Sequence, residues 1–299
     1  MPSSARYSPS AGCGVSCVRE RLPPRGRVER ALDAFVTENR LTLAVVAPLV
    51  GACSMIAGAK GYLPAAIAFS PVALVAGTLM LRLPLAAGLA PLFDRRAAGA
   101  LGGLCAYSYA IEYVGTTTGW PYGEFAYGVE LGPMLAGVPL ALPLFFVPLV
   151  VNAFLLTVLL LGPRADDPRV RLPAVVLLVV GIDGVLDPGA VALGFWAYAD
   201  GGVYYGVPLS NYAGWVLSAS VAAFALDRAF DYERLRARLE ACAFALDDLV
   251  SFVLLWGLVN LAFANWLPVL GALALVAALW RTERFDVALE WPVRGRPWR

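Results

Sequence analysis

The chain has 299 residues, of which 60% are hydrophobic and 15% are charged. Soluble domains are usually about 45–50% apolar and about 25% charged, so this composition excludes an ordinary water-soluble enzyme, a disordered chain and a fibrous repeat. It predicts a polytopic membrane protein, and the net charge of +1 gives no basic field that would attract a nucleic-acid partner.

The residue counts exclude several kinds of site. The chain has 0 histidines, so the sequence cannot build a histidine-rich iron site, an H-E-x-x-H zinc site or a Ser-His or Cys-His nucleophile pair. A retinal pump needs a lysine deep in a helix, whereas the single lysine, Lys60, falls in a predicted loop. The 5 cysteines contain no C-x-x-C pair, so we expect neither a disulfide framework nor a metal site.

Four regions follow one another along the chain. Residues 1–27 are rich in Ser, Pro and Arg and lack the apolar core of a secretory signal, so we expect a disordered basic tail. Residues 28–40 carry one apolar helical face, which predicts a short amphipathic helix lying at the membrane interface. Residues 41–280 are the predicted transmembrane domain, and residues 281–299 are a predicted cytoplasmic tail.

The transmembrane domain is predicted to be an all-α helix bundle of about eight spans, since a helix needs roughly 20 residues to cross the hydrocarbon core. The expected spans are residues 41–59, 62–81, 97–114, 133–161, 172–196, 208–226, 244–260 and 264–280. Residues 83–93 are apolar but short and broken by proline, so we expect them to lie at the interface.

Arginines occur in every second connection between these spans, and the opposite connections hold Lys60 as their one basic residue. This alternation is the positive-inside pattern. It predicts that both termini are cytoplasmic in a multi-pass protein of the cell membrane.

The loops at residues 116–132 and 197–215 lack Lys and Arg and are dense in Gly, Tyr, Trp and acidic residues. Tyr and Trp favour the membrane interface, which is one explanation for them. Because small and acidic residues lie between the rings, we favour an aromatic-walled pocket at the outer face.

The two loops also resemble each other. The first follows Glu112 and ends in GVPL at residues 137–140, and the second follows Asp187 and ends in GVPL at residues 206–209. This pattern indicates a weak parallel repeat, and two independent turn-rich loops are the alternative.

Carboxyl groups within the predicted spans are the strongest functional signal. Glu112 lies near the end of the third span, and Asp183 and Asp187 share one helix face in the fifth. A charge inside the bilayer costs at least a few kcal/mol, and no basic residue is predicted at this depth, so we expect neutral acids that can donate a proton. Snorkelling or helix-to-helix hydrogen bonding is the structural alternative.

Other polar residues in the spans receive different interpretations. Asn211 is assigned to the site because of its loop, and Asn152 to hydrogen bonding between helices. Asp247 and Asp248 are expected to be solvated near the inner interface.

Several motifs resemble the carotenoid hydratase family of integral membrane proteins over roughly residues 28–280. They are EYVG (112–115), TGWPYGEFAY (118–127), GVPL (137–140), DP (187–188), GFW (194–196) and YGVPLSNYAGW (205–215). The resemblance implies hydration of terminal isoprenoid double bonds of an acyclic carotenoid within the lipid membrane, without a metal or redox cofactor. Other enzymes of carotenoid biosynthesis are possible partners.

Hydration of such an alkene needs a proton donor, a pocket that tolerates a carbocation, and a water molecule. We expect Asp187 or Glu112 to be the general acid, while the other positions the water or holds the proton, with Asp183 beside them. The expected groups that bind water are Glu124, Tyr127 and Asn211, and the expected pocket walls are Trp120, Trp196, Tyr205 and Trp215.

Three other functions remain open from the sequence. An intramembrane prenyltransferase would hold Mg²⁺ with paired acidic motifs, and Asp183-x-x-x-Asp187 and Asp227-x-x-x-Asp231 have that spacing. A carotenoid cyclase would begin with the same protonation and shield the cation from water. A transporter or channel would use buried acids for proton coupling.

Overall fold

The structure is a computed structural model, and it describes residues 24–284. The predicted tails at 1–27 and 281–299 lie largely outside this range, although the first helix already begins at Pro24. The helices are α1 (Pro24–Glu38), a π-helical turn η1 (Thr42–Val46), α2 (Ala47–Ala59), α3 (Ala65–Ala68), α4 (Pro71–Leu89), the 3₁₀ turn η2 (Ala90–Leu92), α5 (Arg95–Thr118), α6 (Pro143–Leu161), the 3₁₀ turn η3 (Gly162–Asp166), α7 (Pro168–Leu193), α8 (Leu209–Ala229), α9 (Tyr232–Ala241), α10 (Asp247–Ala262) and α11 (Trp266–Arg281). The strands are β1 (Phe125–Tyr127), β2 (Met134–Leu135), β3 (Val138–Pro139) and β4 (Trp196–Tyr198).

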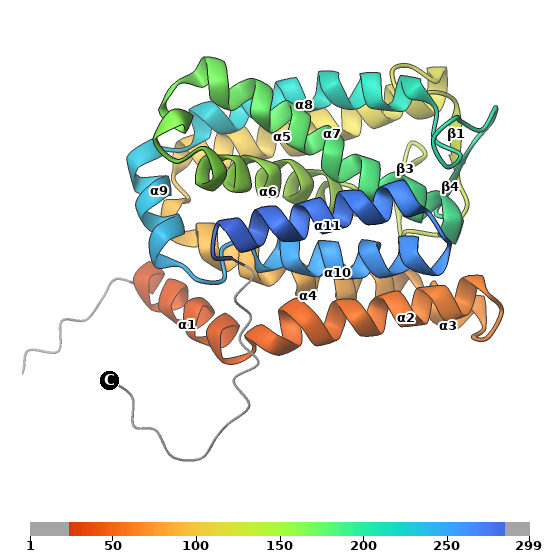
Figure 1. Ribbon diagram of the computed structural model, residues 1–299, viewed down its shortest axis with the longest axis horizontal. Coiled ribbons are helices and arrows are strands. Elements are labelled where there is room, and N and C mark those ends of the chain that lie inside the picture. The colour runs from red at the N-terminus through yellow and green to blue at the C-terminus, as the bar shows by residue number, and fades with distance from the viewer. Residues whose placement is uncertain (1–23, 285–299) are drawn as a thin grey trace, which may run out of the picture.

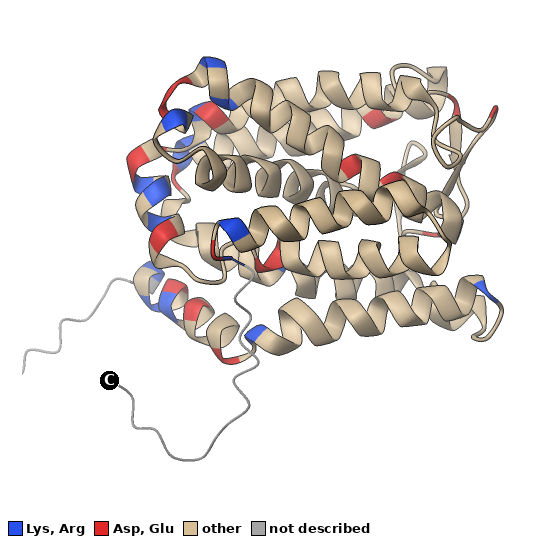
Figure 2. Cartoon of the chain, in the orientation of Figure 1, with Lys and Arg blue, Asp and Glu red and all other residues tan. Residues whose placement is uncertain are grey.

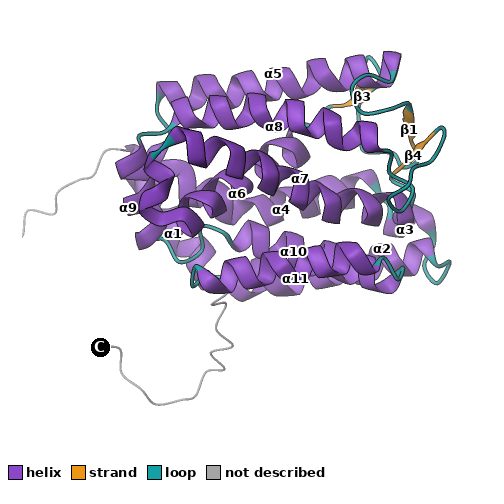
Figure 3. Cartoon of the chain, turned by 45° about the horizontal axis from the view of Figure 1, so that its top comes forward, coloured by secondary structure: helices purple, strands orange, loops and turns teal. Residues whose placement is uncertain are grey.

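The long helices lie side by side along the longest axis of the molecule, and the strands gather at one end (Figures 1 and 3). Within the described chain, five helical segments are long and apolar enough to cross a membrane: Thr42–Ala59, Ala65–Leu92, Pro143–Asp166, Pro168–Leu193 and Leu209–Ala229. The prediction of an all-α, multi-pass membrane protein is therefore confirmed. Its finer count of eight spans exceeds these five helices, since α10 and α11 have only 16 residues each and α5, with 24 residues, is not apolar enough to be counted.

Two predicted boundaries are wrong. Residues 83–93 do not form a separate interfacial segment, because α4 continues through Pro84 to Leu89 and buries Leu85 and Leu89 against the core. A proline removes only one helical hydrogen bond, and this burial compensates for the loss. The span expected over residues 133–161 begins only at Pro143, since β2 and β3 form a hairpin before it.

Helix α6 lies inside the bundle and is buried on all sides from Leu149 to Val158. An entirely apolar helix is stable in such a position because every face meets other protein groups. This helix therefore forms a wall of the cavities described below.

Basic residues gather at the end of the bundle that holds α1 and α9 (Figure 2). Lys60 is the C-cap of α2, and this helix ends at the opposite end of the bundle (Figure 1). The described chain begins in α1 and ends after α11 at this arginine-rich end (Figure 1). The strands lie at the other end, together with the loops that lack basic residues.

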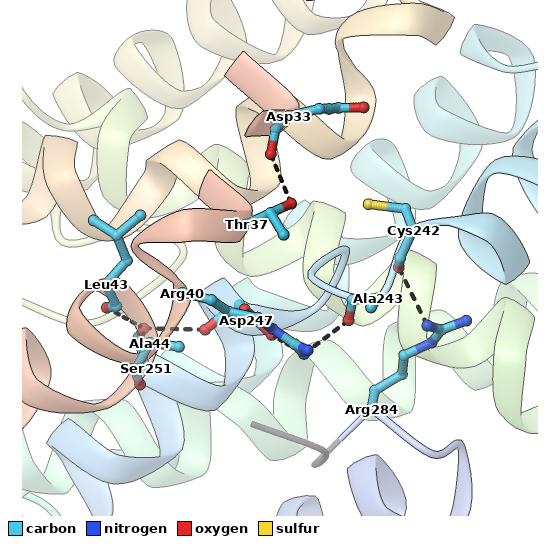
Figure 4. Close-up of polar contacts among 10 residues, drawn as sticks. All are labelled: Asp33, Thr37, Arg40, Leu43, Ala44, Cys242, Ala243, Asp247, Ser251 and Arg284. Carbon is cyan, nitrogen blue, oxygen red and sulfur yellow. Dashed lines mark hydrogen bonds and ion pairs between the residues drawn. The ribbon is translucent and has the colours of Figure 1, made fainter. Parts of the chain in front are cut away.

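Asp247 and Asp248 are fully buried, so the prediction that they are solvated is wrong. Arg40 Nε lies 2.6 Å from Asp247 Oδ2, and Arg82 Nη1 lies 2.5 Å from Asp248 Oδ1 (Figure 4 shows the first pair). Buried carboxylates are retained in a protein when such partners compensate their charge. Asn152 Nδ2 on α6 also donates to Asp248 on α10. Asn152 therefore forms a hydrogen bond between helices, as the sequence predicts.

The π-helical turn before α2 meets the same region of α10. The Ser251 hydroxyl lies 3.2 Å from the Leu43 carbonyl and 3.0 Å from the Asp247 carbonyl (Figure 4). A π-helical turn forms i→i+5 hydrogen bonds in place of the usual i→i+4 bonds. The Ser251 hydroxyl offers a donor to the backbone carbonyls of this turn. Ser251 thus joins the start of α2 to the buried acids of α10.

Candidate active site

The two outer loops are held together by an antiparallel pair of strands. Residues of β1 pair with those of β4 in the register Phe125↔Tyr198, Ala126↔Ala197 and Tyr127↔Trp196. Because side chains alternate along a strand, the four aromatic residues share one face, and the two alanines are exposed on the other. We call this pair of strands the aromatic ribbon.

A second feature is common to the two loops. Ala136 and Gly137 have φ angles of +50° and +84°, and Tyr205 and Gly206 have +52° and +84°. Two successive positive φ values are typical of a tight hairpin turn. The sequence likeness between the loops therefore extends to the backbone of this turn.

The aromatic ribbon covers a cavity of about 130 Å³. Its walls come from α5, α6, α7, α8 and α10, and it is the only described pocket to which Glu112 and Asp187 both contribute. The lining residues are Glu112, Tyr122, Phe125, Tyr127, Leu131, Pro139, Leu142, Phe145, Phe146, Leu149, Leu186, Asp187, Phe195, Trp196, Tyr198, Asn211, Trp215 and Trp256. None of these described lining residues is basic, so the cavity joins carboxyl groups to aromatic rings without a neutralising cation.

Asp187 is oriented by two donors that reach the same oxygen. The Tyr198 hydroxyl donates to Asp187 Oδ2 at 3.1 Å, and Asn211 Nδ2 donates to it at 2.6 Å. Oδ1 of Asp187 is therefore the oxygen available to a ligand in the cavity. Asp187 itself is only 3% exposed.

Asp183 lies one helical turn before Asp187 and is fully buried. Asn211 Nδ2 also donates to Asp183 Oδ2 at 3.1 Å, so a single amide bridges the two carboxyl groups. The remaining oxygen, Asp183 Oδ1, has no hydrogen-bond partner. Two adjacent carboxylates without a cation repel each other, which favours the neutral form of at least one of them.

Glu112 enters the cavity from α5 and accepts a short hydrogen bond from the Tyr127 hydroxyl on its Oε1 atom. The arrangement matches that of Asp187 and Tyr198. In each case a carboxyl group on a helix is bound by the last tyrosine of the strand that follows that helix.

The tyrosines of the aromatic ribbon remain hydrogen-bond donors. Burial, and then the nearby Asp187 carboxylate, raise the pKa of the Tyr198 phenol above its usual value. Burial and Glu112 raise the pKa of Tyr127 in the same way. Both phenols therefore keep their protons and stabilise a negative charge on the carboxyl groups.

Aromatic rings form much of the remaining wall. Trp215 stacks on Phe146 with ring centroids 5.5 Å apart, and Tyr122 lies 6.2 Å from Trp215. Trp196 contacts Phe195 edge to face at 6.3 Å. Such ring faces attract a cation, most strongly where water is excluded.

The structure brings Glu112, Tyr127, Asp187, Trp196, Asn211 and Trp215 to the cavity and links Asp183 to it through Asn211. It does not bring three other predicted residues there. Trp120 is 60% exposed. Glu124 is also exposed, because side chains alternate along the strand and its side chain lies on the face opposite to that of Phe125. Tyr205 occupies the tight turn, where its hydroxyl accepts from the Leu267 amide at 3.2 Å.

Sequence reasoning missed Tyr198, Phe125 and Trp256, all of which line the cavity. A signal for two of them was present, since FAY at 125–127 and WAY at 196–198 alternate aromatic and small residues with the period of a strand. Alternation indicates a strand only over about four to eight residues, and each of these stretches has three.

The paired acidic motifs expected of a prenyltransferase do not meet. Asp227 forms an ion pair with Arg171, and the Asp231 side chain accepts from the Arg234 amide at the start of α9. Both therefore lie where α8 ends and α9 begins, whereas Asp187 lines the cavity beneath the aromatic ribbon and Asp183 is linked to it through Asn211.

Comparison with known proteins adds two matches. The family described as carotenoid biosynthesis protein matches residues 69–279. A bisanhydrobacterioruberin hydratase from Haloarcula japonica is 57% identical over 269 residues, which cover 89% of this chain and 92% of that protein. No solved structure matches the chain.

Both matches cover far more than the short motifs around the cavity, and the resemblance drawn from those motifs is confirmed. This chain belongs to the carotenoid biosynthesis protein family.

Proposed function

We propose that this protein is a carotenoid hydratase, which adds water to the terminal isoprenoid double bonds of bisanhydrobacterioruberin to yield bacterioruberin. The observation that carries the proposal is the cavity beneath the aromatic ribbon, where carboxyl groups face aromatic rings without a basic residue among the lining side chains. The similarity to the hydratase of Haloarcula japonica supports the same reaction.

Asp187 is the proposed proton donor. Its Oδ2 atom accepts from Tyr198 and Asn211, so the proton resides on Oδ1 and can pass to an alkene in the cavity. The same two donors stabilise the carboxylate once the proton has left. Asp183 accepts from the same Asn211 amide and so helps to hold that amide in position beside Asp187.

The reaction proceeds through a tertiary carbocation. The π electrons of the double bond take the Asp187 proton at the less substituted carbon, which leaves the positive charge on the more substituted one. The rings of Trp196, Trp215 and Phe146 stabilise this charge, by up to about 2 kcal/mol for each desolvated ring. A water molecule then forms the new C–O bond.

Glu112 is the proposed partner of that water. Its Oε1 atom is held by Tyr127, which leaves Oε2 to accept a hydrogen bond from the water and take up its proton. Glu112 then passes this proton to the Asp187 carboxylate, so both groups return to their starting states and the net change is the addition of one water.

The proposed topology places the aromatic ribbon at the outer face of the cell membrane and both termini in the cytoplasm. Eight helices cross, namely α2, α4, α5, α6, α7, α8, α10 and α11, and the short pair α10 and α11 is accommodated by local thinning of the bilayer. The gathering of arginines at the opposite end supports this orientation. The substrate reaches the cavity from the lipid, and other enzymes of the pathway are candidate partners.

The deciding experiment expresses the parent protein, Asp187→Asn and Glu112→Gln in a host that accumulates bisanhydrobacterioruberin. The pigments are separated by chromatography, and their molecular masses are measured by mass spectrometry. The parent should add the mass of one water at each end, and Asp187→Asn should lower the rate by about 10²–10⁴-fold. If both variants hydrate as well as the parent, the assignment of the acid is wrong, and if the parent adds no water, the proposed function is wrong.

A further inference from the structure

A second cavity, of about 290 Å³, lies beside the first and is lined by residues of α2, α4, α6, α7 and α10. The two cavities share five lining side chains: Phe145, Leu149, Leu186, Phe195 and Trp256. Most of the remaining wall is apolar, for example Val50, Ile67 and Leu81. The second cavity therefore continues the first and reaches the surface of the bundle beside α2 and α3, where Val50 and Ile67 are exposed.

The size of the first cavity shows that it cannot hold a carotenoid. An engineered cavity of about 150 Å³ holds one benzene ring, so about 130 Å³ holds roughly one five-carbon isoprenoid unit. The chain beyond the reacting unit must leave the first cavity. The second cavity has about twice that volume and an apolar wall, so it offers space for the following part of the chain.

The second cavity also contains an unused hydrogen-bond acceptor. Asn152 lines it and is only 2% exposed. Its Nδ2 atom donates to Asp248, which orients the amide, and its Oδ1 atom has no hydrogen-bond partner. A buried unpaired acceptor is costly, which indicates that a donor is present when the site is in use.

Resting on the proposed function, we infer that the second cavity is a substrate subsite that holds the carotenoid chain beyond the reacting unit and binds a hydroxyl group on that chain through Asn152 Oδ1. Asn152 thereby acts as a specificity residue, because a hydrocarbon chain at this position leaves the acceptor unpaired.

Gly77 allows the cavity to be filled without disturbing the fold. It lines the cavity from α4, and a Cβ atom built on it meets no atom within 4 Å. Gly77→Leu therefore places four additional carbon atoms in the subsite. The matched control is Gly102→Leu on α5, because Gly102 is exposed and its Cβ position is equally open.

The first measurement compares bisanhydrobacterioruberin hydration and pigment retention by the purified proteins in detergent. Gly77→Leu should raise the KM at least about tenfold and retain less pigment, while kcat changes little, because the carboxyl groups are untouched. Gly102→Leu should match the parent. Equal KM values for both variants, or a parent cavity that retains phospholipid in place of pigment, would overturn the subsite.

The second measurement supplies an acyclic hydrocarbon carotenoid and a derivative of equal length that carries one tertiary hydroxyl group. The parent should prefer the hydroxylated carotenoid by at least about tenfold, and Asn152→Leu should lose that preference, so that the ratio of its rates on the two carotenoids approaches one. A parent that hydrates the two equally would overturn the role of Asn152. A parent that hydrates neither these carotenoids nor bisanhydrobacterioruberin would overturn the proposed function itself, whereas the preceding outcomes leave it intact.

Discussion

At the scale of single residues, the orientation of Asp187 decides which of its oxygens can react. Tyr198 and Asn211 both occupy Oδ2, and Asn211 extends the contact to Asp183. A carboxyl group held in this way presents one defined oxygen to the cavity. The hydroxyl of Tyr198 is therefore expected to affect the rate without touching the alkene.

Tyr198→Phe should slow hydration about tenfold or more, because it removes a hydrogen bond that stabilises the carboxylate after proton transfer, worth about 1.5 kcal/mol or more. The measurement is kcat for carotenoid hydration by the purified variant. The control is Tyr204→Phe, since that hydroxyl donates to the backbone carbonyl of Gly184 at 3.3 Å and to no carboxyl group among the described contacts. If the two variants are slowed equally, Tyr198 has only a structural role.

The Tyr204 contact has its own physical reason. Pro188 has no amide proton, so the Gly184 carbonyl lacks its usual partner within α7. The Tyr204 hydroxyl supplies a donor for it. The helix therefore continues through Pro188 to Leu193 although one of its internal hydrogen bonds is missing.

At the scale of elements, the aromatic ribbon is the part that assembles the site. It joins two loops about 70 residues apart and turns the rings of both strands toward one cavity. Gly128 closes the ribbon, since its amide donates to the Phe195 carbonyl at 2.9 Å. A Cβ atom on Gly128 would lie 2.4 Å from the Gly194 carbonyl oxygen.

Gly128→Ala should separate β1 from β4 and lower the hydration rate at least about tenfold, because Tyr127 and Tyr198 lose their positions. The control is Ala126→Ser on the exposed face of the ribbon, which should retain the parent rate. Hydration rate and the amount of folded protein are measured together. Full activity of Gly128→Ala would show that catalysis does not depend on the closed ribbon.

The start of α7 and the end of α8 are joined by a different contact. Arg171 pairs with Asp227 and lies 5.0 Å from the ring centre of Tyr232. Arg171 is only 6% exposed, so the loss of Asp227 leaves a largely buried charge without its carboxylate.

Asp227→Asn should lower the free energy of unfolding by about 1–3 kcal/mol and leave the hydration rate of the folded protein unchanged. Thermal unfolding in detergent checks the first effect, and the pigment assay checks the second. The exposed Glu240→Gln serves as the control and should change stability by less than about 0.5 kcal/mol. A large loss of hydration at constant stability would instead assign Asp227 to the chemistry.

At the scale of the whole molecule, the gathering of arginines at one end of the bundle predicts that this end faces the cytoplasm. In a variant whose native cysteines are replaced by alanine, Asp200→Cys and Glu233→Cys place one exposed thiol at each end. A membrane-impermeant thiol reagent should label only the Asp200→Cys protein in intact cells, and both proteins after permeabilisation. Labelling of Glu233→Cys in intact cells would reverse the proposed topology.

Apolar stretches predicted most of the long helices closely. Residues 97–114 correspond to α5 at Arg95–Thr118, and residues 208–226 correspond to α8 at Leu209–Ala229. The sequence also identified the carboxyl groups of the cavity, because a charge in a membrane helix is costly and therefore conspicuous. Asp247 and Asp248 were misjudged, since their arginine partners are 207 and 166 residues away along the chain.

Composition and local pattern alone determined that this chain is a membrane helix bundle, with arginines at one end and acids within its apolar helices. These properties depend on the transfer of each segment between water and lipid, which neighbouring residues decide. The tertiary structure decided which acids and rings share a cavity, because that depends on the pairing of β1 with β4 and on the packing of α6, α7 and α10. It also decided that Trp120, Glu124 and Tyr205 lie outside the cavity, since a loop residue is directed by the turn that holds it.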